Sequence, residues 1–244
     1  MSNFFRHIFK RLTTSKSKPS HFLCPPQLIY LEDRITPSNT PIIVTTTLDT
    51  DNSGDNVTSL REAITLANAN AGDDTIDFAS SLFSGGAGTI TLLTASLPQI
   101  LDATQLISGV ARGTITITGP GASSLTISGD NGVSERNFNI FNIATGGNLS
   151  ISGVTVSGAN NSSGNGGAFN NFGTLAVTNS TISGNTASNG GGIWNSGTLT
   201  VSDSTISGNS ASQTAAAFII IVVVSLIFII LRFRVTPHLM AVVF

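Results

Sequence analysis

Two consecutive stretches of 24 residues in this chain are near-copies of each other. Residues 166–189 and 190–213 are identical at 15 of 24 positions without a gap. A degenerate earlier copy covers residues 148–158 at a spacing of 26, and similar short runs occur at 113–119 and 123–129. A unit this short cannot bury its apolar residues alone, so neighbouring copies must stack on one another.

The residue pattern inside each copy predicts how the copies stack. Leu199 and Val201 alternate with hydroxyl residues, which is the period of a half-buried strand. Gly-Asn pairs recur at 184–185 and 208–209, where the chain must turn, and stacked asparagines can bond along the axis. The expected interior columns are Leu175–Leu199, Val177–Val201, Ile182–Ile206 and Phe169–Ile193. The predicted fold is all-β, a right-handed parallel β-helix whose coils are about 24 residues long.

The copies also resemble a known bacterial repeat. GGAF at 166–169 and GGGI at 190–193 are each followed by I-x-x-N, at 182–185 and 206–209. This arrangement is similar to the GGA[ILV]…FxxN repeats of polymorphic outer-membrane proteins, with Ile in place of Phe. The resemblance implies a β-helix displayed on a bacterial surface.

A short helix is predicted before the repeats. Ser59 and Glu62 have the spacing of a capping box, and Gly72 supplies a stop before a strand at 75–78. One helical face is apolar and consists of Leu60, Ala63, Ile64 and Ala67. Residues 58–64, TSLREAI, resemble the CSLREAI motif that opens many bacterial surface and secreted β-helix proteins, with Thr58 in place of the cysteine. We expect this helix to cap the N-terminal end of the β-helix.

The beginning of the chain has a different character. Residues 1–40 carry six Lys or Arg against two acids and show no periodic apolar face, so we expect a disordered basic leader. LEDRITPS at 31–38 resembles the leader of many large surface or secreted proteins of planctomycete bacteria, which implies export. The capping module with the first coils then covers 41–112, and the β-helix repeats cover 113–213.

An apolar segment follows the repeats. Residues 215–231, AAAFIIIVVVSLIFIIL, contain Ser225 as their only polar residue and predict a transmembrane helix. Arg232 and Arg234 begin the tail 232–244, so the positive-inside bias places this tail in the cytoplasm and the body outside it. Two alternatives stay open: a buried last element of the fold, or an aberrant end, because the repeat stops within a unit at Gln213.

The composition of the body excludes several kinds of chemistry. His7, His21 and His238 lie near the chain ends and Cys24 is the only cysteine, so the body has no Ser–His or Cys–His pair and no multi-cysteine metal site. Residues 41–214 carry eleven acids and three arginines, a net charge of −8, which disfavours nucleic-acid binding. The acids of the repeats (Asp130, Glu135 and Asp203) form no carboxylate column, so no catalytic residue and no enzymatic activity is predicted.

Two features qualify as weaker candidates for binding. Asp49, Asp51, Ser53 and Asp55 match the opening of a calcium-binding loop, but Leu60 stands where that loop needs a glutamate. The alternative is an acidic turn before the helix, and no other cofactor is predicted. Trp194, the only tryptophan, is a candidate for sugar stacking, with partial packing as the alternative.

These observations predict a non-catalytic, single-pass membrane protein of the cell surface or envelope, adhesin-like or structural. Its expected partners are membrane lipid, through residues 215–231, and cell-surface glycans or proteins. The alternatives are a carbohydrate-binding or carbohydrate-cleaving β-helix, and a truncated relic of a longer repeat protein.

Overall fold

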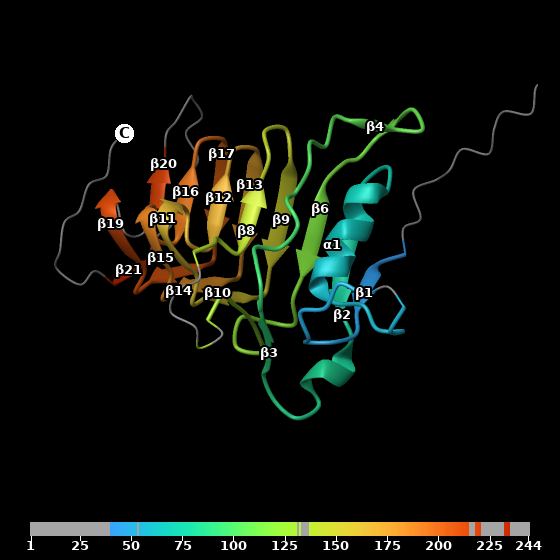
Figure 1. Ribbon diagram of the computed structural model, residues 1–244, viewed down its shortest axis with the longest axis horizontal. Helices are drawn as coiled ribbons and strands as arrows, with labels where there is room; N and C mark the ends of the chain where they lie inside the picture. The colour runs from blue at the N-terminus through green and yellow to red at the C-terminus, as the bar shows by residue number, and fades with distance from the viewer. Residues whose placement is uncertain are drawn as a thin grey trace, which may run out of the picture. The chain divides into compact units, whose positions relative to one another are not determined.

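The computed structural model describes residues 40–52, 54–130, 132, 137–214, 218–220 and 232–234. Strands dominate, and almost all of them lie in four parallel sheets (Figure 1). Sheet 1 is ordered β1 (Ile42–Val44), β2 (Asp74–Phe78), β6 (Ile115–Thr118), β9 (Asn148–Ser152), β13 (Thr174–Thr178) and β17 (Thr198–Ser202). Sheet 2 is ordered β3 (Gly88–Thr91), β7 (Leu125–Ser128), β10 (Thr155–Ser157), β14 (Thr181–Ser183), β18 (Thr205–Ser207) and β21 (Arg232–Arg234).

The other two sheets are smaller. Sheet 3 is ordered β8 (Phe141–Ile143), β12 (Phe169–Asn171), β16 (Ile193–Asn195) and β20 (Phe218–Ile220). Sheet 4 is ordered β11 (Asn160–Asn165), β15 (Thr186–Asn189) and β19 (Ser210–Thr214). The remaining elements are helix α1 (Leu60–Ala69), the short 3-10 helix Ser80–Phe83 and an antiparallel hairpin of β4 (Leu106–Ile107) and β5 (Val110–Ala111).

The chain visits the four sheets in turn, which makes it a solenoid. From β12 it passes through β13, β14 and β15 before β16 returns to sheet 3 beside β12. In the last two coils the partners are 24 residues apart, as in Thr174 with Thr198 and Thr181 with Thr205, and in the coil before them the spacing is 26, as in Thr155 with Thr181. The all-β solenoid of parallel sheets predicted from the repeat is therefore confirmed.

Stacked apolar side chains fill the interior of the coils. Ile117, Ile151, Val177 and Val201 form one column in sheet 1 and are all buried. In sheet 3 the rings of Phe141 and Phe169 stack with centroids 5.1 Å apart and planes inclined by 9°. Each fully buried Val, Ile, Leu or Phe contributes about 1.5–3 kcal/mol. The predicted columns are confirmed, and the stacking between coils supplies the burial that one coil lacks.

Two asparagines, buried Asn185 and part-exposed Asn209, form the predicted ladder at a corner of the coils. The Asn185 side chain is fully buried; its Nδ2 donates to Asn209 Oδ1 at 2.9 Å and to the Val156 carbonyl at 3.1 Å. Its Oδ1 accepts a hydrogen bond from the Ala159 backbone N–H at 3.0 Å. The preceding Gly184 has a φ of +64°, a left-handed conformation that glycine adopts without steric cost. The amides therefore replace backbone partners that the turn removes.

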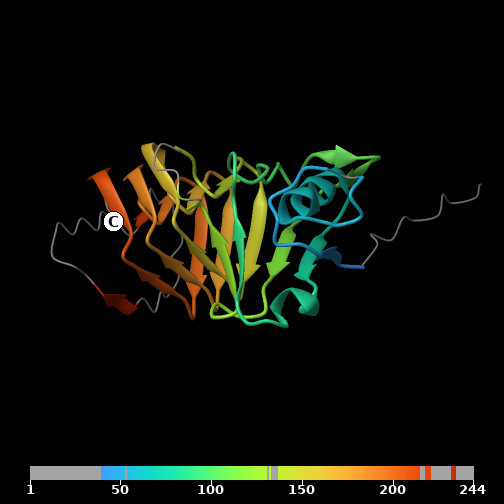
Figure 2. The same ribbon diagram turned by 60° about the horizontal axis from the view of Figure 1, so that its bottom comes forward.

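Helix α1 packs against β1, β2 and β6 of sheet 1 (Figures 1 and 2). Ser59 is its N-cap and Glu62 completes the capping box, as predicted. The helix buries the apolar face predicted from the sequence, which consists of Leu60, Ala63, Ile64 and Ala67. It covers the core next to β1, β2 and β6, the first strands of sheet 1 in the described part of the chain.

The apolar segment 215–231 differs from the prediction where the structure describes it. Phe218–Ile220 form strand β20, parallel to β16, instead of part of a helix. A run rich in β-branched residues is well suited to a strand, and β16 offers an unpaired edge. Residues 215–217, 221–231 and 235–244 lie outside the described part of the chain, as do 1–39 with the LEDRITPS motif. Among the helices that the structure describes, none is long and apolar enough to cross a membrane.

Candidate functional site

Among the described residues, a cluster of charged contacts lies where α1 begins. Arg61 forms a two-point ion pair with Asp49, with Nε 2.8 Å from Oδ1 and Nη2 3.0 Å from Oδ2. The same guanidinium donates to the backbone carbonyls of Ser96 at 2.7 Å and Ala95 at 3.0 Å. The side chains of Arg61 and Asp49 are only 13% and 1% exposed. This clamp joins three segments that are distant in sequence: the loop before the helix, the helix itself and the loop after β3.

Glu62 holds the same loop from its other side. Its Oε1 accepts a hydrogen bond from the Asn52 backbone N–H, and its Oε2 accepts one from the Ser59 N–H, both at 2.8 Å. The Ser59 hydroxyl donates to the Thr50 carbonyl at 2.7 Å. Every polar residue of the S-L-R-E sequence therefore has a structural partner, and the motif fastens the cap.

The predicted calcium ligands are not assembled into a site. Asp49 is committed to Arg61 and also accepts a hydrogen bond from the Leu93 N–H, while Asp55 accepts one from the Val57 N–H. Asp51 is exposed, and Ser53 lies outside the described residues. Within the described ranges, no group of three His, Cys, Asp or Glu side chains could hold a metal ion. A carboxylate whose oxygens already bind a buried guanidinium is a poor calcium ligand, so the acidic-turn interpretation fits this geometry better.

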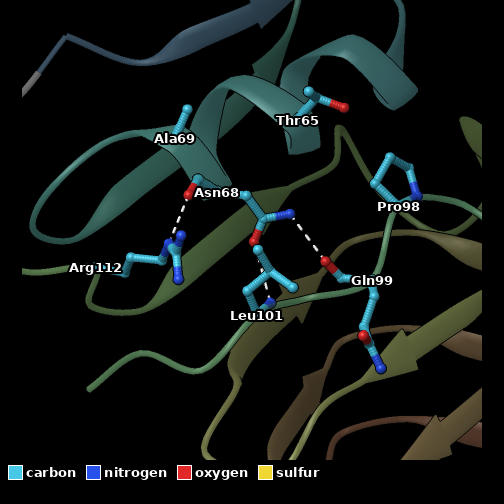
Figure 3. A pocket seen from close by; sticks show the side chains of 7 residues that line it. All are labelled: Thr65, Asn68, Ala69, Pro98, Gln99, Leu101 and Arg112. Carbon is cyan, nitrogen blue, oxygen red and sulfur yellow. Dashed lines mark hydrogen bonds between the residues drawn. The ribbon is translucent and has the colours of Figure 1, made fainter. Parts of the chain in front are cut away.

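A shallow hollow of about 390 Å³ lies beside α1 (Figure 3). It is lined by Thr65, Asn68, Ala69, Pro98, Gln99, Leu101 and Arg112. Asn68 Nδ2 donates to the Gln99 carbonyl at 2.9 Å, and its Oδ1 accepts from the Leu101 N–H at 3.1 Å. Arg112 Nε donates to the Asn68 carbonyl at 2.7 Å. Because its polar groups already bond one another and it has no carboxylate lining, the hollow is a seam between the helix and neighbouring loops.

The carboxylates of the repeats are dispersed. Asp130 follows β7, and Asp203 precedes β18, three strands further along sheet 2. Three strand spacings amount to about 14 Å, more than a pair of carboxylates needs for glycoside hydrolysis. Asp203 has a φ of +48° and is aligned with Asn179 of the preceding coil, which has a φ of +49°. Asp203 therefore occupies a turn position, and Glu135 lies outside the described residues.

Trp194 lies on the outward side of sheet 3. It pairs in register with Asn170 of β12, and its ring centroid is 4.9 Å from that of Phe172, with the planes inclined by 56°. Trp194 is partly exposed, and Phe172 is 40% exposed. The sequence singles out Trp194 because it is the only tryptophan. It does not single out Phe172, because the ring that Phe172 contacts is that of Trp194 in the next coil.

Comparison of the chain with protein-family models, with curated proteins and with solved structures finds no match.

Proposed function

We propose that this chain is a non-catalytic solenoid of a bacterial surface or envelope, adhesin-like or structural, built as a right-handed parallel β-helix. Right-handed connection between parallel strands is the rule in proteins. The observation that supports the proposal is the division of each strand into a buried apolar column and an outward column that is mostly uncharged. In sheet 1 one outward column reads Thr75, Thr116, Ser150, Ala176 and Thr200. A surface that repeats from coil to coil suits contact with extended or repeating partners.

The use of the charged residues argues against catalysis. Arg61, Asp49 and Glu62 bind one another or the backbone of the cap, and Asp130 and Asp203 stand on coils too far apart to act together. A catalytic pair of carboxylates requires facing side chains on one surface.

Carbohydrate binding is the second candidate, favoured by the aromatic pair of Phe172 and Trp194. Two neighbouring exposed rings offer an apolar surface for the face of a sugar. Trp194 is the only tryptophan, so its fluorescence reports on this place alone. Titration with soluble cello- and chito-oligosaccharides should change the emission of the wild type, and Phe172→Ala should weaken the response while Thr200→Ala leaves it intact. An unchanged wild-type emission rejects this candidate.

Membrane attachment through residues 215–231 is a separate part of the proposal. It is supported by the apolar sequence and by Arg232 and Arg234 after it. The strand β20, in contrast, includes three residues of the same segment, Phe218–Ile220. The two arrangements exclude each other, because the eleven residues 221–231 are too few for a spanning helix of about 20 residues.

Cell fractionation with protease added to intact cells distinguishes these arrangements. An anchored protein should stay with the membranes and lose its body to the protease. Replacing Val223 and Val224 by arginine should then release the protein, while Ser225→Ala should not. Recovery of the wild type as a soluble protein would contradict the anchor and favour β20, and recovery only as intracellular aggregate would favour the truncated relic.

A further inference from the structure

Five adjacent strands of sheet 2 present two columns of hydroxyl side chains on the outward side of the sheet, and the columns end where β21 pairs with β18. One column contains only threonines, and the second contains threonine and serines two positions further along each strand. The first column is Thr89, Thr126, Thr155, Thr181 and Thr205, and the second is Thr91, Ser128, Ser157, Ser183 and Ser207. The buried column between them is Ile90, Ile127, Val156, Ile182 and Ile206. We call this outward surface of β3, β7, β10, β14 and β18 the threonine face.

The register makes the threonine face a two-dimensional lattice. Neighbouring strands of a sheet lie about 4.7–4.9 Å apart, and residues two apart on one strand lie about 6.5 Å apart. The five strands lie side by side in the sheet (Figure 2). Hydroxyl groups therefore recur at one spacing along the solenoid and at a second spacing across it.

Most of these hydroxyl groups are available to an external partner. Thr89 and Thr205 are exposed, and Thr126, Thr155 and Thr181 are partly exposed because a neighbouring coil flanks each of them. Among the described residues, the hydroxyls of Thr126, Thr181 and Thr205 have no hydrogen-bond partner, whereas Thr155 donates to the Ala122 carbonyl at 2.6 Å. In the second column, Ser128 is buried and its hydroxyl accepts a hydrogen bond from the Asp130 N–H at 3.1 Å, so it is not available to a partner.

Duplication of a coil accounts for β14 and β18 but not for the other three strands of the threonine face. Successive threonines of the first column are 37, 29, 26 and 24 residues apart, so the coils differ in length and in the loops between strands. Each coil nevertheless carries threonine, an apolar residue, and then threonine or serine. Sheet 1 belongs to the same coils, yet its outward positions include Ile43, Asp77 and Ala176. The uniform run of hydroxyl residues is therefore specific to these five strands of sheet 2.

From this lattice we propose that the threonine face binds the surface of ice crystals. Within the five strands of the threonine face, the column positions carry no charged and no aromatic side chain, and Arg232 and Arg234 of β21 follow only at its edge, in register with Thr205 and Ser207. The uncharged columns disfavour both mineral ions and stacked sugars as ligands. Threonine combines a hydroxyl, which donates and accepts hydrogen bonds, with a methyl group that restricts the water around it. The strand spacing is close to the repeat of oxygen atoms along the a axis of hexagonal ice, so successive coils meet equivalent water positions. Many weak contacts made at once add up to stable attachment.

The test measures how purified full-length protein distributes between slowly growing ice and the remaining liquid. Wild type should be enriched in the ice, while a non-binding protein of similar size is excluded. Thr181→Tyr places a ring at the centre of the threonine face and should reduce the enrichment about tenfold or more, because the remaining threonines no longer engage together. Thr200→Tyr is the matched control, since Thr200 is an equally part-exposed outward threonine on sheet 1. It should leave the enrichment unchanged, and circular dichroism melting of each variant checks that the fold is kept.

Smaller substitutions separate the two parts of the threonine side chain. Thr181→Val keeps the shape and the methyl groups, and Thr181→Ser keeps the hydroxyl; both should lower ice enrichment less than Thr181→Tyr. Exclusion of the wild type from ice, or equal loss in Thr181→Tyr and Thr200→Tyr, would overturn the proposal. Retention on crystalline cellulose without enrichment in ice would also overturn it and assign the face to a polysaccharide. The assay does not depend on cellular location, so its failure leaves the proposed surface function standing.

Discussion

Arg61 and Asp49 form the most deeply buried ion pair among the described residues. Burying two charges is costly, and the cost is met here by four hydrogen bonds from the guanidinium and one from the Leu93 N–H to the carboxylate. Removing one partner would leave the other charge buried without compensation. The main effect of the pair is therefore to fix the positions of the loop 49–52 and the loop after β3 against the helix. Its net contribution to the free energy of unfolding is the smaller effect.

The Arg61→Ala substitution should lower the free energy of unfolding by about 3–5 kcal/mol, because it leaves the Asp49 carboxylate buried and unpaired. Chemical denaturation measures this loss. Arg112→Ala is the control and should cost about 1 kcal/mol, since Arg112 is part-exposed and no buried carboxylate loses its partner. Equal losses for the two variants would contradict the role of the buried pair.

Asp74 predicts a dependence of stability on pH. Burial raises the pKa of its carboxyl, opposed by a hydrogen bond from Asn70 and reinforced by the neighbouring charge of Asp73. Its Oδ2 is buried without a partner among the described residues. Because the folded-state pKa is raised, the unfolded state ionises first as the pH rises above the ordinary aspartate value. The stability contributed by protonated Asp74 is therefore complete below that value and is lost as the pH rises through the folded-state pKa.

Asp74→Asn should therefore be more stable than the wild type at neutral pH, because the amide stays uncharged and can still accept the Asn70 hydrogen bond. Denaturation midpoints measured from pH 3 to neutrality should converge at the acid end of the series. Asp203→Asn, at an exposed turn, is the comparison for a change from aspartate to asparagine outside the buried site. A neutral-pH loss of stability in Asp74→Asn would contradict this interpretation.

The corners between strands depend on the asparagine ladder. Asn185 bonds Asn209 of the next coil and the backbone of the preceding coil, so it connects three coils. At another corner the side chain of Asn171 bonds that of Asn195. Glycine is required beside this second ladder, where the coils approach closely, because a Cβ on Gly197 would lie 2.0 Å from the Gly173 carbonyl oxygen. The corner sequences thus combine glycine with asparagine, whose side-chain amide forms hydrogen bonds with backbone groups at the turn.

Asn185→Ala should destabilise the protein by about 2–4 kcal/mol, because the Ala159 N–H and the Val156 carbonyl lose a buried partner. Asn148→Ala is the matched control, at a part-exposed outward position of β9, and should change stability by at most about 0.5 kcal/mol. Thermal melting of both variants gives the comparison. Similar melting temperatures for the two would show that the ladder is dispensable.

The solenoid as a whole derives its stability from contacts between adjacent coils. Its cooperativity should therefore depend on the number of complete coils. Helix α1 covers the core at the first coils, and β17 is the last strand of sheet 1 in the described part of the chain.

Insertion of a second copy of residues 166–189 after Asn189 should be accepted, because equivalent residues of the copies already pair in register. The free energy of unfolding should rise by about 1–4 kcal/mol for 24 added residues, and the denaturant slope should rise with the added buried surface. Insertion of only residues 166–177 is the control: it breaks the register, so it should destabilise the fold. A longer chain that is no more stable would contradict additive coil stacking.

Much of the fold could be predicted because its information is local. The alternation at Leu175 and Val177 and its recurrence at Leu199 and Val201 indicate both the strands and the columns. Ser59 and Glu62 likewise mark a helix start within four residues. The segment 215–231 was harder to assign, because an apolar β-branched run is compatible with a membrane helix or with a strand, and β16 provides the edge that β20 pairs with.

The repeat period and the alternation within each coil follow from the amino-acid sequence, because a period of 24 residues leaves stacking as the way to bury the apolar columns. The partners that meet across loops do not follow from it. Arg61 reaches Asp49, Ala95 and Ser96, and Phe172 meets Trp194, along paths set by how the intervening loops pack. A periodic pattern specifies which side of a strand faces the core, whereas only the packed coils bring particular side chains together on the outside.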